Sequence, residues 1–149
     1  MDKTIRAANA SDRQVLCELY RQLNPDDPPW PSDAHTADAL ASVLAQAGTT
    51  ILICEAGGVA VSTCMLVVCP NFSRAGRPFA LIENVVTHRE HRRHGHGRRV
   101  VARAIEIARE RGCYRVTLMT GSRREETLRF YEGTGMRRNT KTAFEARFT

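Results

Sequence analysis

The stretch from Phe79 to Ala108 constrains the fold more than any other part of the chain. It begins with an apolar run, FALIENVVT (79–87), and passes through twelve residues crowded with arginine, histidine and glycine. It continues with apolar residues spaced three and four positions apart. A short apolar, β-branched run is typical of a buried strand, and the three-to-four spacing is typical of an amphipathic helix. We therefore expect a strand, a tight turn and a helix in this order.

The remaining elements follow from the same two periodicities. Gly57-Gly58 predicts a two-residue hairpin turn between two strands, and the patterns Ser11/Gln14 and Ser122/Glu125 predict helix-capping boxes. We expect further strands over 3–8, 49–56, 59–68, 113–120 and 142–149, and further helices over 11–23, 37–47 and 123–132. This order predicts one α/β domain of the α+β type over residues 1–149, with an antiparallel first half and a β-helix-β unit in the second half.

Bulk properties narrow the class of protein. The 149 residues suit one domain. No apolar run approaches the ~20 residues that cross a bilayer, and the opening MDKTIRAANASDRQ lacks the apolar core of a signal peptide. The five cysteines are odd in number and form no CxxC pair, which favours reduced thiols. We therefore expect a cytoplasmic protein without a membrane partner.

The segment HREHRRHGHGRR (88–99) combines positive charge with glycine. The start of the following helix presents amide groups without intrahelical partners, together with a partial positive charge, and this combination binds phosphate. Gly95 and Gly97 allow the backbone to approach an anion closely, and neighbouring arginines add charge-assisted hydrogen bonds. The segment fits a pyrophosphate-binding turn, although a lone GxG also fits a basic helix cap on a solvated face.

Two other functions compete for the same segment. Its four histidines are close in sequence: His88, His91, His94 and His96. Arginines surround them and Glu90 is the nearest carboxylate in sequence, so we expect no metal site. The net charge of +6 suits an anionic partner, but aromatic residues make up 6% of the chain and none interrupts the basic run. Base stacking has no platform there, and we expect no nucleic-acid partner.

These residues resemble a known family. Arg92-Arg93-His94-Gly95-His96-Gly97 matches the R/Q-x-x-G-x-G/A signature of the GCN5-related N-acetyltransferase (GNAT) superfamily. LIENVVTHREHRRHGHGRRVV (81–101), GCYRVTLMTGS (112–122) and TLRFYEGTGM (127–136) resemble the family's strand, loop and helix segments in order. The resemblance covers nearly the whole chain and is most similar to glucosamine-6-phosphate N-acetyltransferases and small bacterial members. It implies the GNAT-like acyl-CoA acyltransferase fold, with a mixed central sheet and helices on both faces.

The resemblance also implies acetyl transfer from acetyl-CoA to an amine, without a metal. Backbone amides of the turn would hold the CoA diphosphate, the strand before it would pair with the pantetheine arm, and one of that strand's amides would stabilise the oxyanion. The implied CoA contacts are Val85, Val86, Arg92, Arg93, His94, Gly95, His96, Gly97, Arg98, Thr127 and Tyr131. Thr127 stands where many relatives carry asparagine. A homodimer is expected by the same analogy.

Acetyl transfer to an amine needs a base for the ammonium proton and an acid for the departing thiolate. Glu83 is the candidate base because it interrupts an apolar strand, where a carboxylate is costly unless it is paired, hydrated or functional. Tyr131 is the candidate acid, because the family places a tyrosine near the CoA sulfur. The sugar-phosphate branch carries aspartate where this chain has Asn84.

The acceptor is predicted to be a small-molecule amine, and the loops NPDDPPWP (24–31) and CPNFSRAGRP (69–78) are its candidate contacts. Asp26, Asp27 and Trp30 would attract a cationic amine, whereas Arg74 and Arg77 would attract a phosphate or carboxylate. Ordinary loop composition explains all five equally well. Two further functions stay open: a non-catalytic acyl-CoA-binding sensor and a basic nucleic-acid-binding module.

Overall fold

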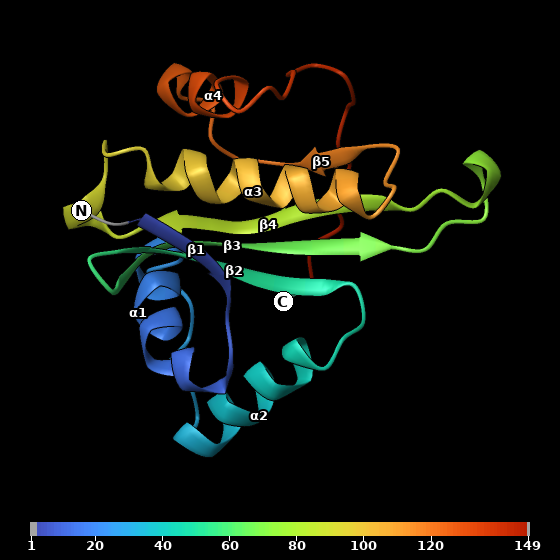
Figure 1. Ribbon diagram of the computed structural model, residues 1–149. Helices are drawn as coiled ribbons and strands as arrows, with labels where there is room; N and C mark the ends of the chain where they lie inside the picture. Colours follow the sequence, from blue (N-terminus) through green and yellow to red (C-terminus); the bar gives the residue numbers. More distant parts are fainter. Residues whose placement is uncertain (1–2, 149) are drawn as a thin grey trace. The chain divides into compact units, whose positions relative to one another are not determined.

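The computed structural model describes residues 3–148 and contains one five-stranded sheet (Figure 1). The chain divides into two compact units, one ending at Leu118 and one beginning at Met119. The elements of the first unit are β1 (Lys3–Ala7), α1 (Arg13–Leu23), α2 (Asp33–Leu44), β2 (Thr49–Ala56), β3 (Val59–Cys69), β4 (Phe79–Thr87), α3 (His96–Glu110) and β5 (Val116–Leu118). The second unit contains α4 (Glu125–Glu132).

The sheet has the strand order β1-β2-β3-β4-β5. Its first three pairings are antiparallel and the β4–β5 pairing is parallel, with α3 as the connection between these two strands. Gly57 and Gly58 join β2 to β3 with φ angles of 58° and 78°, as expected for a two-residue hairpin turn. The predicted antiparallel first half and β-helix-β second half are therefore confirmed.

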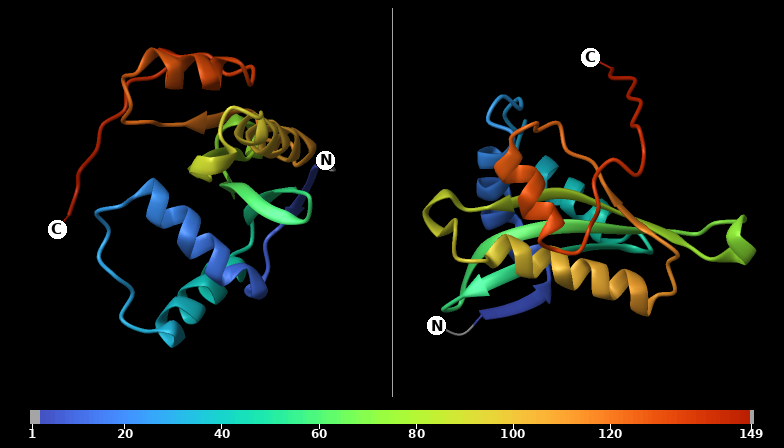
Figure 2. Two further views of the ribbon diagram at one scale, coloured as in Figure 1. Left: turned by 90° about the vertical axis from the view of Figure 1, so that its left-hand side faces the viewer. Right: turned by 90° about the horizontal axis from the view of Figure 1, so that it is seen from above.

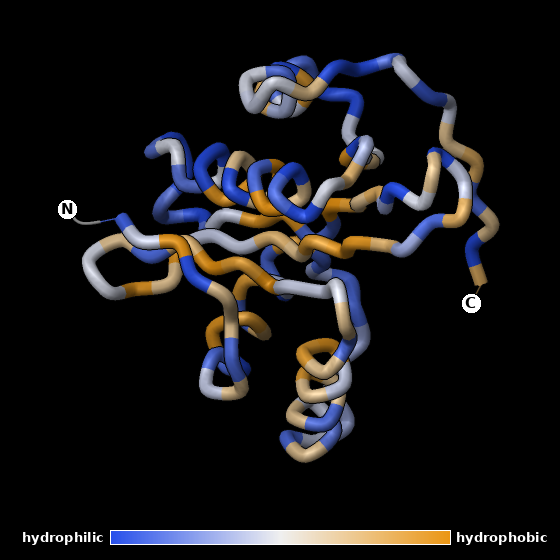
Figure 3. The backbone as a smooth tube through the Cα atoms, turned by 45° about the vertical axis from the view of Figure 1, so that its right-hand side comes forward, coloured by the Kyte–Doolittle hydropathy of each residue, from blue (hydrophilic) through white to orange (hydrophobic). Residues whose placement is uncertain are grey.

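Helices cover both faces of this sheet, as Figure 2 shows for α1 and α2 on one face and α3 on the other. The apolar side of α3, including Val100, Val101 and Ala104, packs on Leu66 and Ile82. On the opposite face a second cluster joins α1 and α2 to β2: Leu16, Leu40, Val43, Ile51 and Ile53. Hydropathy along the backbone follows this layering, because the apolar stretches concentrate in the strands (Figure 3).

Helix starts in the first unit differ from the prediction. The 3-10 turn that leads into α1 is capped by Asn9 and Asp12, not by Ser11 and Gln14. The Asn9 side chain accepts the Ser11 amide proton at 2.9 Å, and Asp12 accepts the Asn9 amide proton at 2.8 Å. The α2 helix begins four residues earlier than predicted, because Ser32 caps it by accepting the His35 amide proton at 3.1 Å.

Regular structure in the second half is shorter than predicted. The β5 strand covers Val116–Leu118 rather than 113–120, and α4 begins at Glu125 with Arg124 at its cap position. The expected closing strand over 142–149 is wrong for its described part, 142–148, which contains no strand. Phe144 and Phe148 are 95% and 89% exposed. Their alternation is strand-like, but a strand also needs a hydrogen-bonded neighbour. Residue 149 lies outside the described residues.

Candidate functional site

The turn between β4 and α3 leaves a row of backbone amides exposed to a ligand. Arg93 and Gly95 have φ angles of 64° and 79°, and α3 starts at His96 without a side-chain cap. Within the described chain, the amides of 94–98 donate to no acceptor. A Cβ added at Gly95 would meet no chain atom within 4 Å, so there is open space beside these amides. This arrangement suits an anion at the helix start, as predicted.

Positive charge surrounds the turn. Arg92, Arg93 and Arg98 are exposed. Lys3, at the start of β1, donates from Nζ to the carbonyl of His94 at 3.2 Å, and Arg99 Nη2 donates to the carbonyl of Lys3 at 3.1 Å. Sequence analysis missed Lys3, because strand order alone brings β1 next to this turn. In the sequence, Lys3 is visible only as a cation at the start of the first strand, and nothing nearby in the sequence connects it to the turn.

His96 forms a buried support for the turn. It is 4% exposed, its ring stacks on His94 with centroids 6.1 Å apart, and its Nδ1 lies 3.9 Å from Sγ of Cys54. Burial, assisted by the nearby Lys3, lowers the pKa of His96 below its usual value, which favours the neutral ring at pH 7. No group of three or more metal-ligating side chains with suitable geometry occurs within residues 3–148.

A bulge in β4 places polar groups on one face of the sheet. Thr63 pairs with Val86, and Met65 pairs with Glu83, so Asn84 and Val85 together stand opposite Cys64. Asn84 has a φ angle of 53°, a left-handed conformation that asparagine tolerates better than most residues. The Glu83 side chain shares its face with Met65, because directly paired residues point to the same side. Asn84 reaches that face through the bulge.

The other edge of β4 is open after Ile82. The β4–β5 pairing extends from Ala80–Val116 to Ile82–Leu118 and ends there. The backbone edge of β4 at Val85 and Val86 therefore faces no β5 residue. An extended ligand arm can hydrogen-bond to such an edge as an additional strand. The role of Val85 and Val86 as pantetheine contacts stays a prediction; the Val86 carbonyl already accepts a hydrogen bond from Ser62 Oγ at 3.0 Å. The open edge leads directly to the turn before α3.

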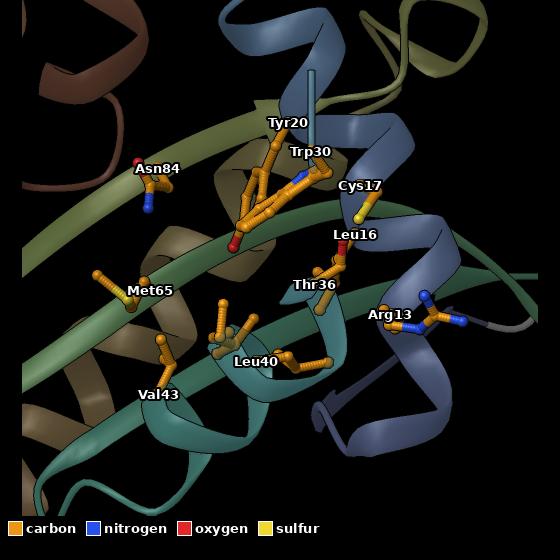
Figure 4. Close-up of a pocket in the computed structure, with 12 residues that line it drawn as sticks. Arg13, Leu16, Cys17, Tyr20, Trp30, Thr36, Leu40, Val43, Met65 and Asn84 are labelled. Atoms are coloured by element: carbon orange, nitrogen blue, oxygen red, sulfur yellow. The ribbon is translucent and has the colours of Figure 1, made fainter. Parts of the chain in front are cut away.

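Beside the bulge lies a pocket of about 130 Å³ between the α1–α2 layer and the sheet (Figure 4). Its walls come from α1, the following loop, α2 and three strands. The lining residues are Arg13, Leu16, Cys17, Tyr20, Trp30, Thr36, Ala39, Leu40, Val43, Ile51, Met65 and Asn84. Leu16, Tyr20 and Leu40 lie on apolar helix stripes of the sequence, and such a stripe looks the same whether it lines a core or a pocket.

The predicted acceptor residues are dispersed. Trp30 lines the pocket, whereas Asp26 and Asp27 are exposed and outside its lining. Arg77 donates to the carbonyls of Gly112 and Cys113 at 3.3 and 3.2 Å. Arg74 stacks over the ring of Tyr114 at 5.3 Å. Both arginines therefore contact the segment after α3, at the opposite end of that helix from the amide-rich turn.

The second unit contains Thr127 and Tyr131 on α4. Thr127 Oγ1 accepts a hydrogen bond from Ser122 Oγ at 3.2 Å. The ring of Tyr131 is half-buried and packs edge-on against Phe130, with centroids 4.9 Å apart. This packing fixes the ring of Tyr131 within its own unit.

Comparison with known proteins gives the family. The model of the Acetyltransferase (GNAT) family matches residues 14–136. The chain belongs to the GNAT family of acetyltransferases. It is similar to glucosamine 6-phosphate N-acetyltransferase of Trypanosoma brucei brucei, with 32% identity over 139 residues, covering 92% of this chain and 90% of the relative.

Solved GNAT structures confirm the fold. A protein of Agrobacterium tumefaciens str. C58 assigned as an acetyltransferase has 43% identity and a TM-score of 0.91, covering 97% of this chain and 99% of its own. Glucosamine-6-phosphate N-acetyltransferase from Arabidopsis thaliana has a TM-score of 0.86 over the full length of both chains, with 24% identity. The described part of the chain has no helix that is long and apolar enough to cross a membrane.

Proposed function

We propose that this GNAT protein transfers an acetyl group from acetyl-CoA to the primary amine of a small molecule, by direct attack and without an acetylated enzyme intermediate. When bound, acetyl-CoA supplies a reactive thioester. The observation that carries the proposal is the continuity of two backbone surfaces within the described residues: the β4 edge beyond Ile82, which faces no β5 residue, and the amides of 94–98, which donate to no acceptor. The first suits the pantetheine arm, and the second suits the diphosphate.

The amides of Gly95, His96 and Gly97 bind the diphosphate, and Arg92, Arg93 and Arg98 add charge around it. Val85 and Val86 hold the pantetheine arm through their backbone, and an amide of this segment donates to the thioester oxygen as negative charge develops. Lys3 contributes a further cation, because its ammonium group already contacts the carbonyl of His94 at 3.2 Å.

Glu83 acts as the base, directly or through a water molecule. An alkylammonium has a pKa near ~10 and must lose a proton before it can attack. Glu83 accepts that proton, the amine nitrogen forms a bond to the acetyl carbon, and the carbon–sulfur bond then breaks. Tyr131 donates its hydroxyl proton to the departing sulfur, and the phenolate then takes the extra proton from the nitrogen of the new amide. The proton on Glu83 is released to solvent. Asn84, beside Glu83 in the bulge, faces the acceptor.

The test is release of free thiol from acetyl-CoA with a panel of primary amines. Glu83→Gln and Tyr131→Phe should each lower kcat by roughly 10²-fold or more, while CoA affinity by calorimetry stays within about twofold. Glu55→Gln is a matched control for Glu83, since Glu55 is a half-buried strand carboxylate paired with Arg6 at 2.8 Å. Intact CoA binding with no amine turned over would favour the acyl-CoA-binding sensor instead.

A further inference from the structure

The pocket beside the bulge is unusual for a site that would take a phosphorylated sugar, because its walls are mainly apolar. Leucine, valine, isoleucine, methionine and alanine side chains supply half of the lining, with Tyr20 and Trp30 as aromatic members. Trp30 is 52% exposed, although it belongs to the pocket wall. Apolar walls of this kind favour an apolar ligand group.

The cationic side chains are not arranged to bind a phosphate in this pocket. Arg13 is the cation among its lining residues, and Nη1 of Arg13 already contacts the carboxylate and the backbone carbonyl of Asp33, both at 3.3 Å. Arg74 and Arg77 contact the segment after α3 instead. A sugar phosphate placed here would lose water from its charge, and among the lining residues only Arg13 could pair with it, after leaving Asp33.

The position of the pocket relates it to the proposed base. Met65 lines the pocket and is the direct cross-strand partner of Glu83, and Asn84 also lines it. An acceptor whose body occupies the pocket therefore has its amine near the Glu83–Asn84 bulge. The volume of about 130 Å³ limits that body. An apolar cavity of about 150 Å³ holds a benzene ring, so a ring or a chain of several methylenes fills this one.

The hydroxyl of Tyr20 is a buried polar group beside the pocket. Tyr20 extends from α1 with its hydroxyl toward the interior (Figure 4). Among the described residues it is the buried side-chain oxygen without a hydrogen-bond partner. Burial raises the pKa of Tyr20 to about 12, so the hydroxyl stays protonated. The side chain of Thr63 opposes this rise in the pKa of Tyr20, and it donates its own proton to the carbonyl of Leu52 at 2.7 Å.

We infer that the acceptor is a primary amine carrying a compact apolar group, aliphatic or aromatic, that fills the pocket between α1, α2 and the sheet. This inference rests on the proposed acetyl transfer and names its substrate class. The acceptor therefore differs in chemistry from glucosamine 6-phosphate, the sugar named for the Trypanosoma relative.

The experiment measures kcat/KM for straight-chain amines from propylamine to heptylamine, for benzylamine and for glucosamine 6-phosphate, with saturating acetyl-CoA. These alkylamines have nearly equal basicity, so chain length reports burial rather than nucleophilicity. We expect a rise of about fourfold per methylene, ending where the pocket is full. Benzylamine should exceed propylamine, and glucosamine 6-phosphate should be the poorest acceptor.

Two substitutions on α2 provide the structural control. Ala39 lines the pocket and Ala41 is exposed on the same helix, outside the lining. Ala39→Leu should lower kcat/KM for hexylamine and benzylamine at least tenfold and leave the KM for acetyl-CoA unchanged. Ala41→Leu should leave every value within twofold.

Three results would overturn the inference. A flat alkylamine series, or a preference for glucosamine 6-phosphate, would remove the apolar acceptor while leaving acetyl transfer intact. A rate that rises with acyl length from acetyl- to hexanoyl-CoA, but not with amine length, would assign the pocket to the acyl group. Absence of thiol release with every amine, despite CoA binding, would overturn the proposed function and this inference together.

Discussion

Replacing Gly95 with alanine tests the turn before α3 most selectively. Gly95 has a φ angle of 79°, and a Cβ built there meets no atom of the chain within 4 Å. The substitution therefore causes no steric clash inside the protein, and its cost to folding is limited to backbone strain. The new methyl group would project into the space next to the amides that we assign to the CoA diphosphate.

The magnitude follows from these two effects. An alanine held in a left-handed conformation costs roughly 1–2 kcal/mol, which corresponds to a fall in Tm of about 2–4 °C per kcal/mol for a chain of this size. Displacing the diphosphate from one amide loses a hydrogen bond to a charged group, about 1.5–3 kcal/mol. We therefore expect the KM for acetyl-CoA to rise at least tenfold.

Gly112→Ala is a matched control at the other end of the same helix. Gly112 also has a φ angle of 79° and open space at its Cβ. It terminates α3, where the Cys113 amide donates to the carbonyl of Ala108 at 3.0 Å, as in a Schellman motif. Thermal denaturation should show similar losses for both variants, and steady-state kinetics should show a higher KM for acetyl-CoA in Gly95→Ala alone. Equal KM values in the two variants would refute the assignment of the turn.

Three further substitutions test the stability of the first unit. Asp12→Asn should lower the free energy of unfolding by about 1.5–3 kcal/mol in urea titrations at pH 7, because it removes the carboxylate charge and at least one of the two 2.8 Å bonds from Arg6. Arg6 also lowers the pKa of Asp12. This stabilisation is therefore present above about pH 3.9 and is lost as the pH falls through the folded-state pKa. If the free energy of unfolding of the variant fell with acidification as steeply as that of the wild type, this assignment would be contradicted. Burial lowers the pKa of His96, so the unfolded state binds more protons below about pH 6.5 and the free energy of unfolding falls on acidification. His96→Asn should make this fall between pH 7 and 5 less steep. An equally steep fall in the variant would exclude His96 as its source. Leu66→Ala, at a side chain with 0% exposure, should cost about 3–5 kcal/mol, and a loss below about 1 kcal/mol would show that the α3 layer repacks.

Local sequence signals predicted the elements on which the proposed donor site rests. The runs 49–56 and 79–87 form strands with the predicted bounds, because apolar side chains and flanking turn residues agree there. The helix expected directly after the basic segment begins at His96, since charge, glycine and the following apolar spacing mark the same boundary.

Features that depend on long-range pairing could not be predicted in this way. The bulge at Asn84 arises from the register between β3 and β4, and 79–87 reads as one uninterrupted strand. The pocket draws Tyr20, Trp30 and Met65 from separate segments. The alternation at Phe144 and Phe148 predicted a strand face, but it carried no information about a neighbouring strand. Each of these features requires a partner that lies far away in sequence.

The central claim is that a diphosphate binds to the amides at the start of α3, and a crystal structure of the protein with CoA tests it most directly. We predict diphosphate oxygens at ~2.7–3.2 Å from the amide nitrogens of Gly95, His96 and Gly97, with the pantetheine arm along Val85 and Val86. A diphosphate bound elsewhere, with these amides left in contact with solvent, would contradict the claim.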